Sequence, residues 1–409
     1  MTKFIAIIGT LDTKSDQVEY LKKLIQERGH QTTIIDVGVL GTVSCEATVT
    51  RRQVAQAAGS SLEEIIAFNH EGKAMGKMAD GACKIVKELY SKGELDGIIA
   101  VGGSMGTSLT LKVMDVLPLS LPKLILSTIA YSPAINPDLL CNGVLMMSFV
   151  GGLYGTNEIA KRILGQAAAI ISAAAEAYKK EPITKKKLIG ITTLGMAASR
   201  YLSHFKPGLE KRGYEIAVFH ATGMNTRTLE KAIEEGLISA VLDLRIGTEL
   251  MSQVCGSLYA PGFHRLESAA KRRIPQVLSP AGIETCLWAP YKPLPPRFAR
   301  RKMFEHNPLL IVFSTTTEEK MKVASIMAKK LNQLMGPTAL ILTTKSSPAV
   351  IAHGMSDPDG VRAFGEVLKR ALKPDIKVVE LDASNDDPEF ADEAIRLLDE
   401  MVGSQRYQQ

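Results

Sequence analysis

The loop after the first apolar run of this chain has the residue types of an anion site. Gly9-Thr10-Leu11-Asp12-Thr13-Lys14-Ser15 follows the run Ile5–Ile8 and precedes a helical pattern. Backbone N–H groups at a helix start attract anions, and nearby hydroxyl and lysine side chains add donors. The spacing differs from a Walker A loop, in which a glycine precedes a Gly-Lys-Thr/Ser ending. The segment predicts either a phosphate-binding loop or a helix capped by Thr13 or Ser15.

A second loop, Val101–Ser108, is rich in glycine and hydroxyl residues. Glycine lets a backbone approach a ligand closely, and hydroxyl groups can donate to phosphate oxygens. A plain strand-to-helix turn rarely needs three residues of each kind, so we interpret this loop as phosphate-binding. A third segment, Leu126–Ala130, ends another apolar run. The carboxyl ends of parallel strands share one edge of a sheet, and we therefore expect the three segments to converge.

A different set of residues could carry acid–base chemistry in the second half of the chain. His220 ends an apolar run, Arg245 and Glu249 follow another, and His306 precedes an Asn-Pro pair. Histidine with carboxylates can transfer protons near neutral pH. Each histidine alone also fits a structural role, at a strand end or in a turn. The set supports a second hypothesis, an enzyme that acts on a small molecule in a cleft between the halves. Regularly spaced metal ligands are not seen in the sequence.

The elements that position these residues alternate along the chain as apolar runs and helical patterns. This alternation is typical of parallel sheets with crossover helices, so we predict an α/β fold of two doubly wound, Rossmann-like domains. The predicted strands of the first half are Ile5–Ile8, Thr32–Asp36, Gly97–Val101 and Lys123–Leu126. Those of the second half are Lys187–Thr192, Ile216–His220, Ala240–Leu244, Gln276–Leu278, Leu309–Phe313, Thr338–Leu342 and Lys377–Leu381.

The division between the halves is predicted at a charged segment that contains Pro182. A chain of 409 residues is too long for one hydrophobic core, and the strand pattern restarts after Lys179–Lys187. We predict domains at residues 1–180 and 185–409. In both halves a strand and a helix are followed by an Arg-Gly pair, at Arg28-Gly29 and Arg212-Gly213. This spacing fits an internal duplication and equally fits generic α/β units.

Composition argues against several classes of partner. The net charge is +6 with scattered basic residues, and 5% of residues are aromatic, which does not favour nucleic-acid binding. The longest later apolar stretch, Ala167–Ala175, falls short of the roughly 20 residues of a membrane span. Five separated cysteines without a CxxC pair fit free thiols in a reducing compartment. We therefore expect a cytoplasmic protein without a membrane segment.

Seven motifs in order carry a family resemblance. They are GTLDTK, GGSMGT, FHATG, GxxRLExAA at Gly262–Ala270, RIPQVLSPAGIE, HNP and KLNQLMGP. From about residue 3 to 402 the chain resembles the ATP-binding domain family named after the tomato mosaic virus resistance protein. It departs from that pattern at Met224–Thr226, at Arg245–Thr248 and over Ser132–Leu153.

The resemblance implies two α/β subdomains, a homodimer, and ATP held by the first subdomain, with or without Mg²⁺. Asp12 is the carboxylate that could hold the metal ion near the phosphates. The leading hypothesis is thus an ATP-binding protein of unassigned physiological role. Carried over by position, the nucleotide site comprises Gly9, Thr10, Asp12, Thr13, Lys14, Gly102, Gly103, Ser104, Gly106, Thr107, Ser127 and Thr128.

Overall fold

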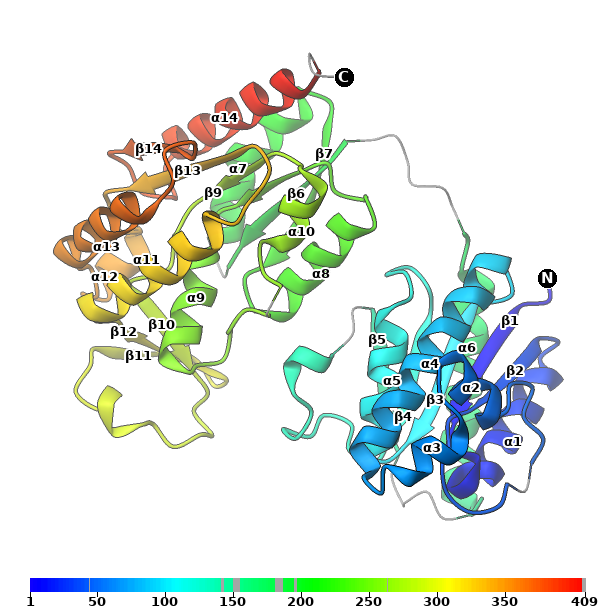
Figure 1. Cartoon of the computed structure of the whole chain (residues 1–409). Coiled ribbons are helices and arrows are strands. Elements are labelled where there is room, and N and C mark those ends of the chain that lie inside the picture. The colour runs from blue at the N-terminus through cyan, green and yellow to red at the C-terminus, as the bar shows by residue number, and fades with distance from the viewer. Residues whose placement is uncertain are drawn as a thin grey trace. The chain divides into compact units, whose positions relative to one another are not determined.

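The chain folds as two compact α/β units, as the sequence predicts (Figure 1). The computed structural model describes residues 1–43, 45–140, 143–149, 155–180, 187–194, 197–262 and 264–406. The units comprise residues 1–181 and 182–409, and each has its own parallel sheet. Most of the predicted linker, residues 181–186, lies outside the described part of the chain.

The first unit is a five-stranded parallel sheet with helices on both faces. Its strands are β1 (Phe4–Gly9), β2 (Gln31–Asp36), β3 (Gly97–Gly102), β4 (Lys123–Ser127) and β5 (Val144–Ser148), in the order β2-β1-β3-β4-β5. The side chains of β1 alternate between two apolar cores. Ile7 packs with α1 (Leu11–Glu27) and α6 (Glu158–Ala177), and Ile8 packs with α2 (Arg51–Ala57), α3 (Leu62–Ala67), α4 (Glu71–Lys92) and α5 (Ser104–Asp115). A short 3₁₀ helix, η1 (Pro137–Leu139), precedes β5.

The strand order of this unit determines where a ligand could bind. The chain crosses from β1 to β2 on one side and then returns to place β3 on the other side of β1. This reversal makes a topological switch point between β1 and β3, where the loops after the two strands diverge over opposite faces. Those two loops are the glycine- and hydroxyl-containing segments of the sequence.

The second unit is a six-stranded parallel sheet with an antiparallel addition. The parallel strands are β6 (Lys187–Thr193), β7 (Tyr214–His220), β8 (Ala240–Asp243), β9 (Gln276–Leu278), β13 (Thr338–Thr343) and β14 (Lys377–Leu381), in the order β14-β13-β9-β8-β6-β7. The helices are α7 (Ala197–Glu210), α8 (Met224–Glu234), α9 (Ile246–Cys255), α10 (Glu267–Arg272), α11 (Thr317–Leu331), α12 (Pro348–Ala352), α13 (Pro358–Ala371) and α14 (Pro388–Arg406). The apolar core on one face includes α7 and α14, and the core on the other includes α9, α11 and α13.

One predicted strand belongs to this addition and not to the parallel sheet. The predicted run Leu309–Phe313 forms β12 (Leu310–Ser314), which pairs antiparallel with β10 (Thr285–Trp288) and β11 (Met303–Asn307). A 3₁₀ helix, η2 (Pro296–Phe298), lies between β10 and β11. The alternation along the sequence therefore predicted the strand but not its sheet.

Both units share the beginning of their topology. The order β2-β1-β3-β4 in the first unit corresponds to β7-β6-β8-β9 in the second. The glycines of the two Arg-Gly pairs, Gly29 and Gly213, have positive φ angles of 85° and 77°, as expected for residues that end helices. These features fit the duplication hypothesis as well as the common doubly wound fold. Across the described residues, no helix is long and apolar enough to cross a membrane.

Candidate functional site

A pocket of about 650 Å³ lies at the switch point of the first unit. Its volume is within the range of roughly 300–1,000 Å³ that small-molecule sites occupy. The loops after β1 and β3 form part of the wall, and the segment that enters α4 forms another part. The lining residues are Thr10, Asp12, Thr13, Lys14, Val39, Leu40, Ile66, Asn69, His70, Glu71, Ala74, Met75, Gly103, Ser104, Met105, Gly106 and Thr128.

Eight of the twelve residues predicted for the nucleotide site line this pocket, and four do not. The eight are Thr10, Asp12, Thr13, Lys14, Gly103, Ser104, Gly106 and Thr128. The other four are packing residues. A Cβ atom on Gly9 would lie 2.7 Å from Val18, and one on Gly102 would lie 2.8 Å from the Cα of Gly106. The buried hydroxyls of Thr107 and Ser127 bond to each other at 2.7 Å.

The loop after β1 is held by the buried carboxylate of Asp36. Its Oδ1 accepts hydrogen bonds from the amides of Leu11 at 3.1 Å and Gly38 at 2.9 Å. Burial raises the pKa of Asp36, and the two amide donors oppose that rise. Asp36 therefore joins the first turn of α1 to the end of β2 and fixes the position of the loop.

The alternative prediction for the loop after β1, a helix capped by Thr13 or Ser15, does not describe the start of α1. The helix begins at Leu11, and Thr10 precedes it without a capping side-chain bond in the described structure. The hydroxyls of Thr10 and Thr13 bond to each other at 2.8 Å, while Ser15 donates to the carbonyl oxygen of Leu11. Neither Thr13 nor Ser15 caps the helix, so the hydroxyls of Thr10 and Thr13 remain at the pocket wall.

The start of α5 forms the opposite wall, and a glycine precedes it. Gly103 is the N-cap residue of α5. Because glycine has no side chain, the described structure shows no side-chain cap on the first-turn amides of this helix. Such amides, at the positive end of a helix dipole, attract anions. A Cβ atom on Gly103 would meet only the hydroxyl of Thr128, at 3.7 Å. The space over Gly103 therefore belongs to the pocket.

Lys14, in α1, supplies a cationic side chain to the pocket wall formed by the loop after β1. Its backbone departs from helical geometry, with φ −131° and ψ 16°, although it lies within α1. The ammonium group donates to the carbonyl oxygen of Thr13 at 3.1 Å. Burial lowers the pKa of Lys14, and the nearby charge of Asp12 partly opposes this.

Asp12 holds a neighbouring loop in place. Its Oδ2 accepts hydrogen bonds from the amides of Val39 at 3.0 Å and Leu40 at 2.8 Å. A Cβ atom on Gly38 would lie 2.7 Å from the same oxygen, so the loop can approach only because Gly38 lacks one. In the part of the chain that the structure describes, no three His, Cys, Asp or Glu residues form a metal cluster.

The third wall of the pocket, between α3 and α4, was not predicted from the sequence. Asn69 has a positive φ of 44°, and His70 caps α4 by accepting from the amide of Lys73 at 3.3 Å. Leu40 and Ile66 are apolar lining residues that remain 62% and 49% exposed. The polar pair Asn69-His70 interrupts an otherwise helical pattern in the sequence. This break was the feature from which a loop at the pocket could have been predicted.

The second-half residues occupy different surroundings. Glu249 is fully buried, and its carboxylate accepts from the amide of Gly223 at 2.7 Å, the hydroxyl of Thr226 at 2.5 Å and Nε of Arg265 at 2.7 Å. Burial raises the pKa of Glu249, and the charge of Arg265 opposes this. Arg265 also forms buried ion pairs with Asp243 at 2.6 Å and with Glu230. Glu249 is therefore part of a buried cluster that joins loops, without access for a substrate.

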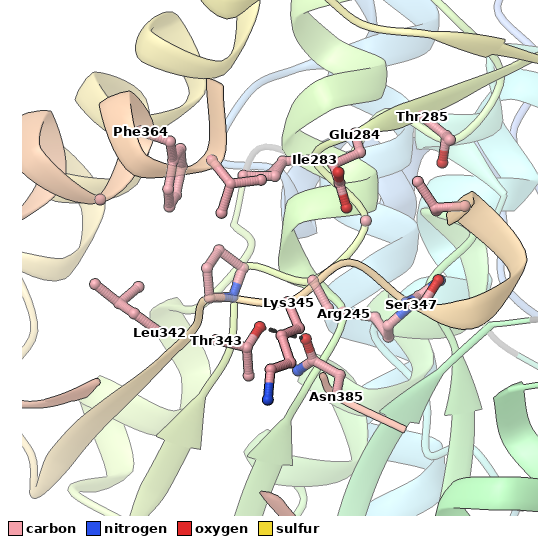
Figure 2. Close-up of a pocket in the computed structure, with 16 residues that line it drawn as sticks. Arg245, Ile283, Glu284, Thr285, Leu342, Thr343, Lys345, Ser347, Phe364 and Asn385 are labelled. Atoms are coloured by element: carbon pink, nitrogen blue, oxygen red, sulfur yellow. Dashed lines mark hydrogen bonds between the residues drawn. The ribbon is translucent and has the colours of Figure 1, made fainter. Parts of the chain in front are cut away.

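The other three acid–base candidates lie on separate elements of the second unit. His220 is exposed at the end of the edge strand β7, and His306 is exposed on β11 of the antiparallel sheet. Arg245 precedes α9 and lines a smaller pocket (Figure 2). In the described structure, no bond or ion pair joins any two of His220, Arg245, Glu249 and His306.

Comparison with known proteins identifies relatives over the whole chain. Two sequence profiles of an uncharacterised protein family, UPF0261, match: its N-terminal domain over residues 3–180 and its C-terminal domain over residues 186–402. A UPF0261 protein of Brucella suis is 36% identical over 400 residues, which cover 97% of this chain and 95% of that protein. The ToMV resistance protein Tm-1(GCR237) of Solanum lycopersicum is 29% identical over 90% of this chain and 51% of its own length.

Similarity to solved structures is weak. A putative UDP-N-acetylglucosamine 2-epimerase from Listeria monocytogenes is 10% identical and covers 68% of this chain and 79% of its own. Its TM-score of 0.23 is too low to support an argument about fold or function.

Proposed function

This chain belongs to the uncharacterised protein family UPF0261, and we propose that its first unit binds ATP in the pocket between the loops after β1 and β3. The observation that carries the proposal is the convergence of two helix starts, at Leu11 and Ser104, on one pocket of nucleotide size. The choice of ATP among phosphorylated ligands rests on the family resemblance of the motifs.

The phosphates would lie over the first turn of α5, beside the loop after β1. The amides of that turn have no capping side chain and are directed donors, and the hydroxyls of Thr10, Ser104 and Thr128 line the same pocket. At α1, the amides of Leu11, Thr13 and Lys14 already donate to Asp36 and Thr10. Lys14 adds a point charge, which a triphosphate needs because amide dipoles alone neutralise little of its charge. Any Mg²⁺ would bind the phosphate oxygens, with Asp12 as a carboxylate on the wall formed by the loop after β1.

The base would lie toward the apolar part of the wall. Val39, Leu40, Ile66, Met75 and Met105 line the pocket and offer apolar surface to a flat ring. Sites for small molecules commonly combine such apolar surface with a few polar groups that orient the ligand. The neighbouring Asn69, His70 and Glu71 are polar lining residues on this side.

A calorimetric titration of the full-length protein with ATP tests the proposal. Lys14→Ala should weaken binding by about 1–3 kcal/mol, the scale of a hydrogen bond to a charged group. Gly103→Val should weaken it more, because the valine side chain would enter the pocket near Thr128. The φ of −80° at Gly103 is open to valine, so this variant should still fold.

His220→Ala is the control, because this exposed residue belongs to the second unit. It should leave the ATP affinity unchanged. If His220→Ala abolishes binding while Lys14→Ala has no effect, the nucleotide does not bind in the first unit. Circular dichroism of each variant establishes that a lost titration is not lost folding.

The remaining expectations belong to the same proposal. We propose that the protein is a cytoplasmic homodimer. Its ATP-bound form would have a regulatory role, by interacting with other molecules. The enzyme alternative loses its main carboxylate, because Glu249 is enclosed by Arg265, Thr226 and Gly223.

A further inference from the structure

The second unit has a cavity of its own, at the carboxyl ends of four parallel strands (Figure 2). Arg245 follows β8, the segment Pro280–Glu284 follows β9, Lys345 follows β13, and Asn385 follows β14. The cavity volume is about 70 Å³. In open α/β sheets, ligands bind at this edge. The proposed function uses only the first unit, so this cavity is independent of it.

The loop after β9, which forms one wall of the cavity, packs closely against α9. A Cβ atom on Gly247 would lie 1.9 Å from the carbonyl oxygen of Pro280. A Cβ atom on Gly282, where φ is +92°, would lie 2.1 Å from the hydroxyl of Thr248. The backbone of this loop can therefore contact the first turn of α9 only because both residues are glycine. The contact fixes the loop against the helix that Arg245 precedes.

The floor of the cavity is held by Asn385. Its Oδ1 accepts from the hydroxyl of Thr343 at 2.8 Å, and its Nδ2 donates to the hydroxyl of Ser279 at 2.7 Å. Asn385 thus joins the ends of β9 and β13 to the segment after β14, and Figure 2 shows it beside Thr343 and Lys345. These bonds give the polar side of the cavity a defined geometry.

Arg245 lines the cavity and forms no ion pair with any residue that the structure describes. Its Nε is buried and has no hydrogen-bond partner among the residues that the structure describes. Lys345, the second lining cation, pairs with Asp382 at 3.3 Å and donates to the carbonyl oxygen of the same residue. A buried donor without an acceptor is rare and calls for an explanation, such as a ligand.

Glu284 restricts which anion could be that ligand. Its Oε1 accepts from the hydroxyl of Ser346 at 2.6 Å and from the amide of Asp357 at 3.0 Å, and the side chain is buried. It lines the same cavity as Arg245, so its negative charge opposes a dianion more strongly than a monoanion. This favours a single carboxylate over a phosphate.

The opposite side of the cavity is apolar and small. Ile283, Leu342 and Phe364 lie on this side in Figure 2. A single water needs roughly 10–15 Å³ of such volume, so the cavity has room for only about five or six non-hydrogen atoms. A nucleotide is far too large, whereas a short carboxylic acid fits.

We propose that this cavity binds a carboxylic acid of a few carbon atoms, with the carboxylate on Arg245 and the alkyl part against Phe364. Planar guanidinium groups bind carboxylates through directed, charge-assisted hydrogen bonds. The cavity is thus a second ligand site, in the unit that does not hold the nucleotide.

Ligand-observed NMR on the full-length protein tests this with propionate, butyrate and inorganic phosphate as probes. Propionate and butyrate should bind, and phosphate should not displace them. Arg245→Met should weaken propionate by about tenfold or more, because it removes the charged donors and keeps the side-chain length. Arg362→Met is the matched control, since Arg362 is an exposed residue of α13, and it should change nothing.

A second variant separates loss of the site from loss of folding. Gly365 lies within α13 and lines the cavity, and a Cβ atom on it would meet only Leu342, at 3.9 Å. Gly365→Leu should therefore fold, fill the apolar side and abolish propionate binding. Propionate binding that survives both Arg245→Met and Gly365→Leu overturns the proposal. So does the absence of propionate and butyrate binding, or displacement of both by phosphate. None of these outcomes bears on ATP binding in the first unit.

Discussion

The carboxylate of Asp12 accepts a hydrogen bond from the backbone amide of Leu40 at 2.8 Å, across 28 residues of sequence. The same oxygen accepts from the amide of Val39. A residue in the first turn of α1 therefore fixes the loop that supplies Val39 and Leu40 to the apolar wall of the pocket. Asp12 has two candidate roles, as an anchor for this loop and as a ligand for Mg²⁺.

Substitutions at Asp12 separate these roles. Asp12→Asn keeps one side-chain oxygen that can accept the loop amides, whereas Asp12→Ala keeps none. We expect Asp12→Ala to lower the free energy of unfolding by about 1–2 kcal/mol and Asp12→Asn by less. Urea denaturation measures both values. In our proposal Mg²⁺ binds the phosphate oxygens, and Oδ2 of Asp12 already accepts two amides. ATP titrations of Asp12→Asn, with and without Mg²⁺, should therefore show the same magnesium dependence as those of the unmodified protein. If that dependence disappears, Asp12 is a metal ligand.

The pH dependence of ATP binding should reveal Lys14. Burial lowers the pKa of Lys14 below its ordinary value of 10.5, with an opposing effect from Asp12. Its positive charge is therefore lost at a lower pH than that of an ordinary lysine, and ATP affinity should fall as the pH rises toward 10.5. In Lys14→Arg the charge persists throughout this range, so the decline should be much smaller. Equal declines in both proteins would show that Lys14 does not contact the phosphates.

The sequence predicted the site loops better than the complete pocket. Residues Gly9–Lys14 and Gly102–Thr107 combine glycine, hydroxyl groups and a strand end, and these local features do not depend on the rest of the fold. The wall at Ile66–Met75 depends on how α3 and α4 pack against the loops, and the sequence does not show that packing. Glu249 is a residue for which the sequence predicted a role in the site that its surroundings do not support. Its type suggested chemistry, but its burial against Arg265, 16 residues away, is a tertiary property.

Missed elements have a common physical cause, which is the absence of a recognisable apolar period. Helix α9 was not predicted because both its polar and its apolar residues are buried, including Thr248, Glu249 and Ser252. It therefore lacks the polar face by which amphipathic helices are recognised. Strand β11 has the opposite composition, with exposed Met303, Glu305 and His306, and so lacks a buried stripe. The central parallel strands β1, β3, β4, β8 and β9 were predicted because both of their faces are buried. The parallel strand β5 is partly exposed and was not predicted.

Our expectation for the oligomeric state rests on the family resemblance and on the frequency of two-fold pairing among soluble proteins. We expect a homodimer at micromolar concentration. Light scattering coupled to size-exclusion chromatography gives the mass directly. For a chain of 44.3 kDa, a measured mass equal to a single chain contradicts this expectation.

The division of the chain should be visible in proteolysis. The two compact units divide between residues 181 and 182, and five lysines lie within Lys179–Lys187. Brief digestion with trypsin should cut this segment first, because it is rich in lysine and connects two units that fold separately. Mass spectrometry of the fragments identifies the cut. A first cut within β1 to β3 would be inconsistent with a stable first unit.

The stability of the second unit should depend on an ion pair between Lys320 and Asp357. Lys320 is fully buried in α11, and its Nζ donates to Asp357 at 2.8 Å and to the carbonyl oxygen of Thr315 at 3.2 Å. Asp357 also caps α13 by accepting from the amide of Gly360. Asp357→Asn preserves the cap, because asparagine is an equally good N-cap residue, but removes the charge. It leaves the buried ammonium without its anion and should cost about 2 kcal/mol.

Lys320→Met should cost less than Asp357→Asn, although both remove the same pair. Methionine has an apolar side chain of similar length, and the remaining carboxylate of Asp357 is partly exposed and still caps α13. In the double variant the asparagine should add little to the cost of Lys320→Met. Urea denaturation of the three variants at neutral pH measures these free energies. A smaller loss for Asp357→Asn than for Lys320→Met would contradict the argument.

Acid should remove the contribution of this pair. Burial raises the pKa of Asp357, but the bond from Lys320 and the amide of Gly360 outweigh it, and the net shift is downward from 3.8. A carboxyl with a lowered pKa in the folded state stabilises the fold above its unfolded-state pKa. That stability is lost as the pH falls through the folded-state pKa. The difference in unfolding free energy between the unmodified protein and Asp357→Asn should therefore be constant near pH 7 and shrink below pH 3.8. A difference that does not change with pH would mean that the charge of Asp357 does not stabilise the fold.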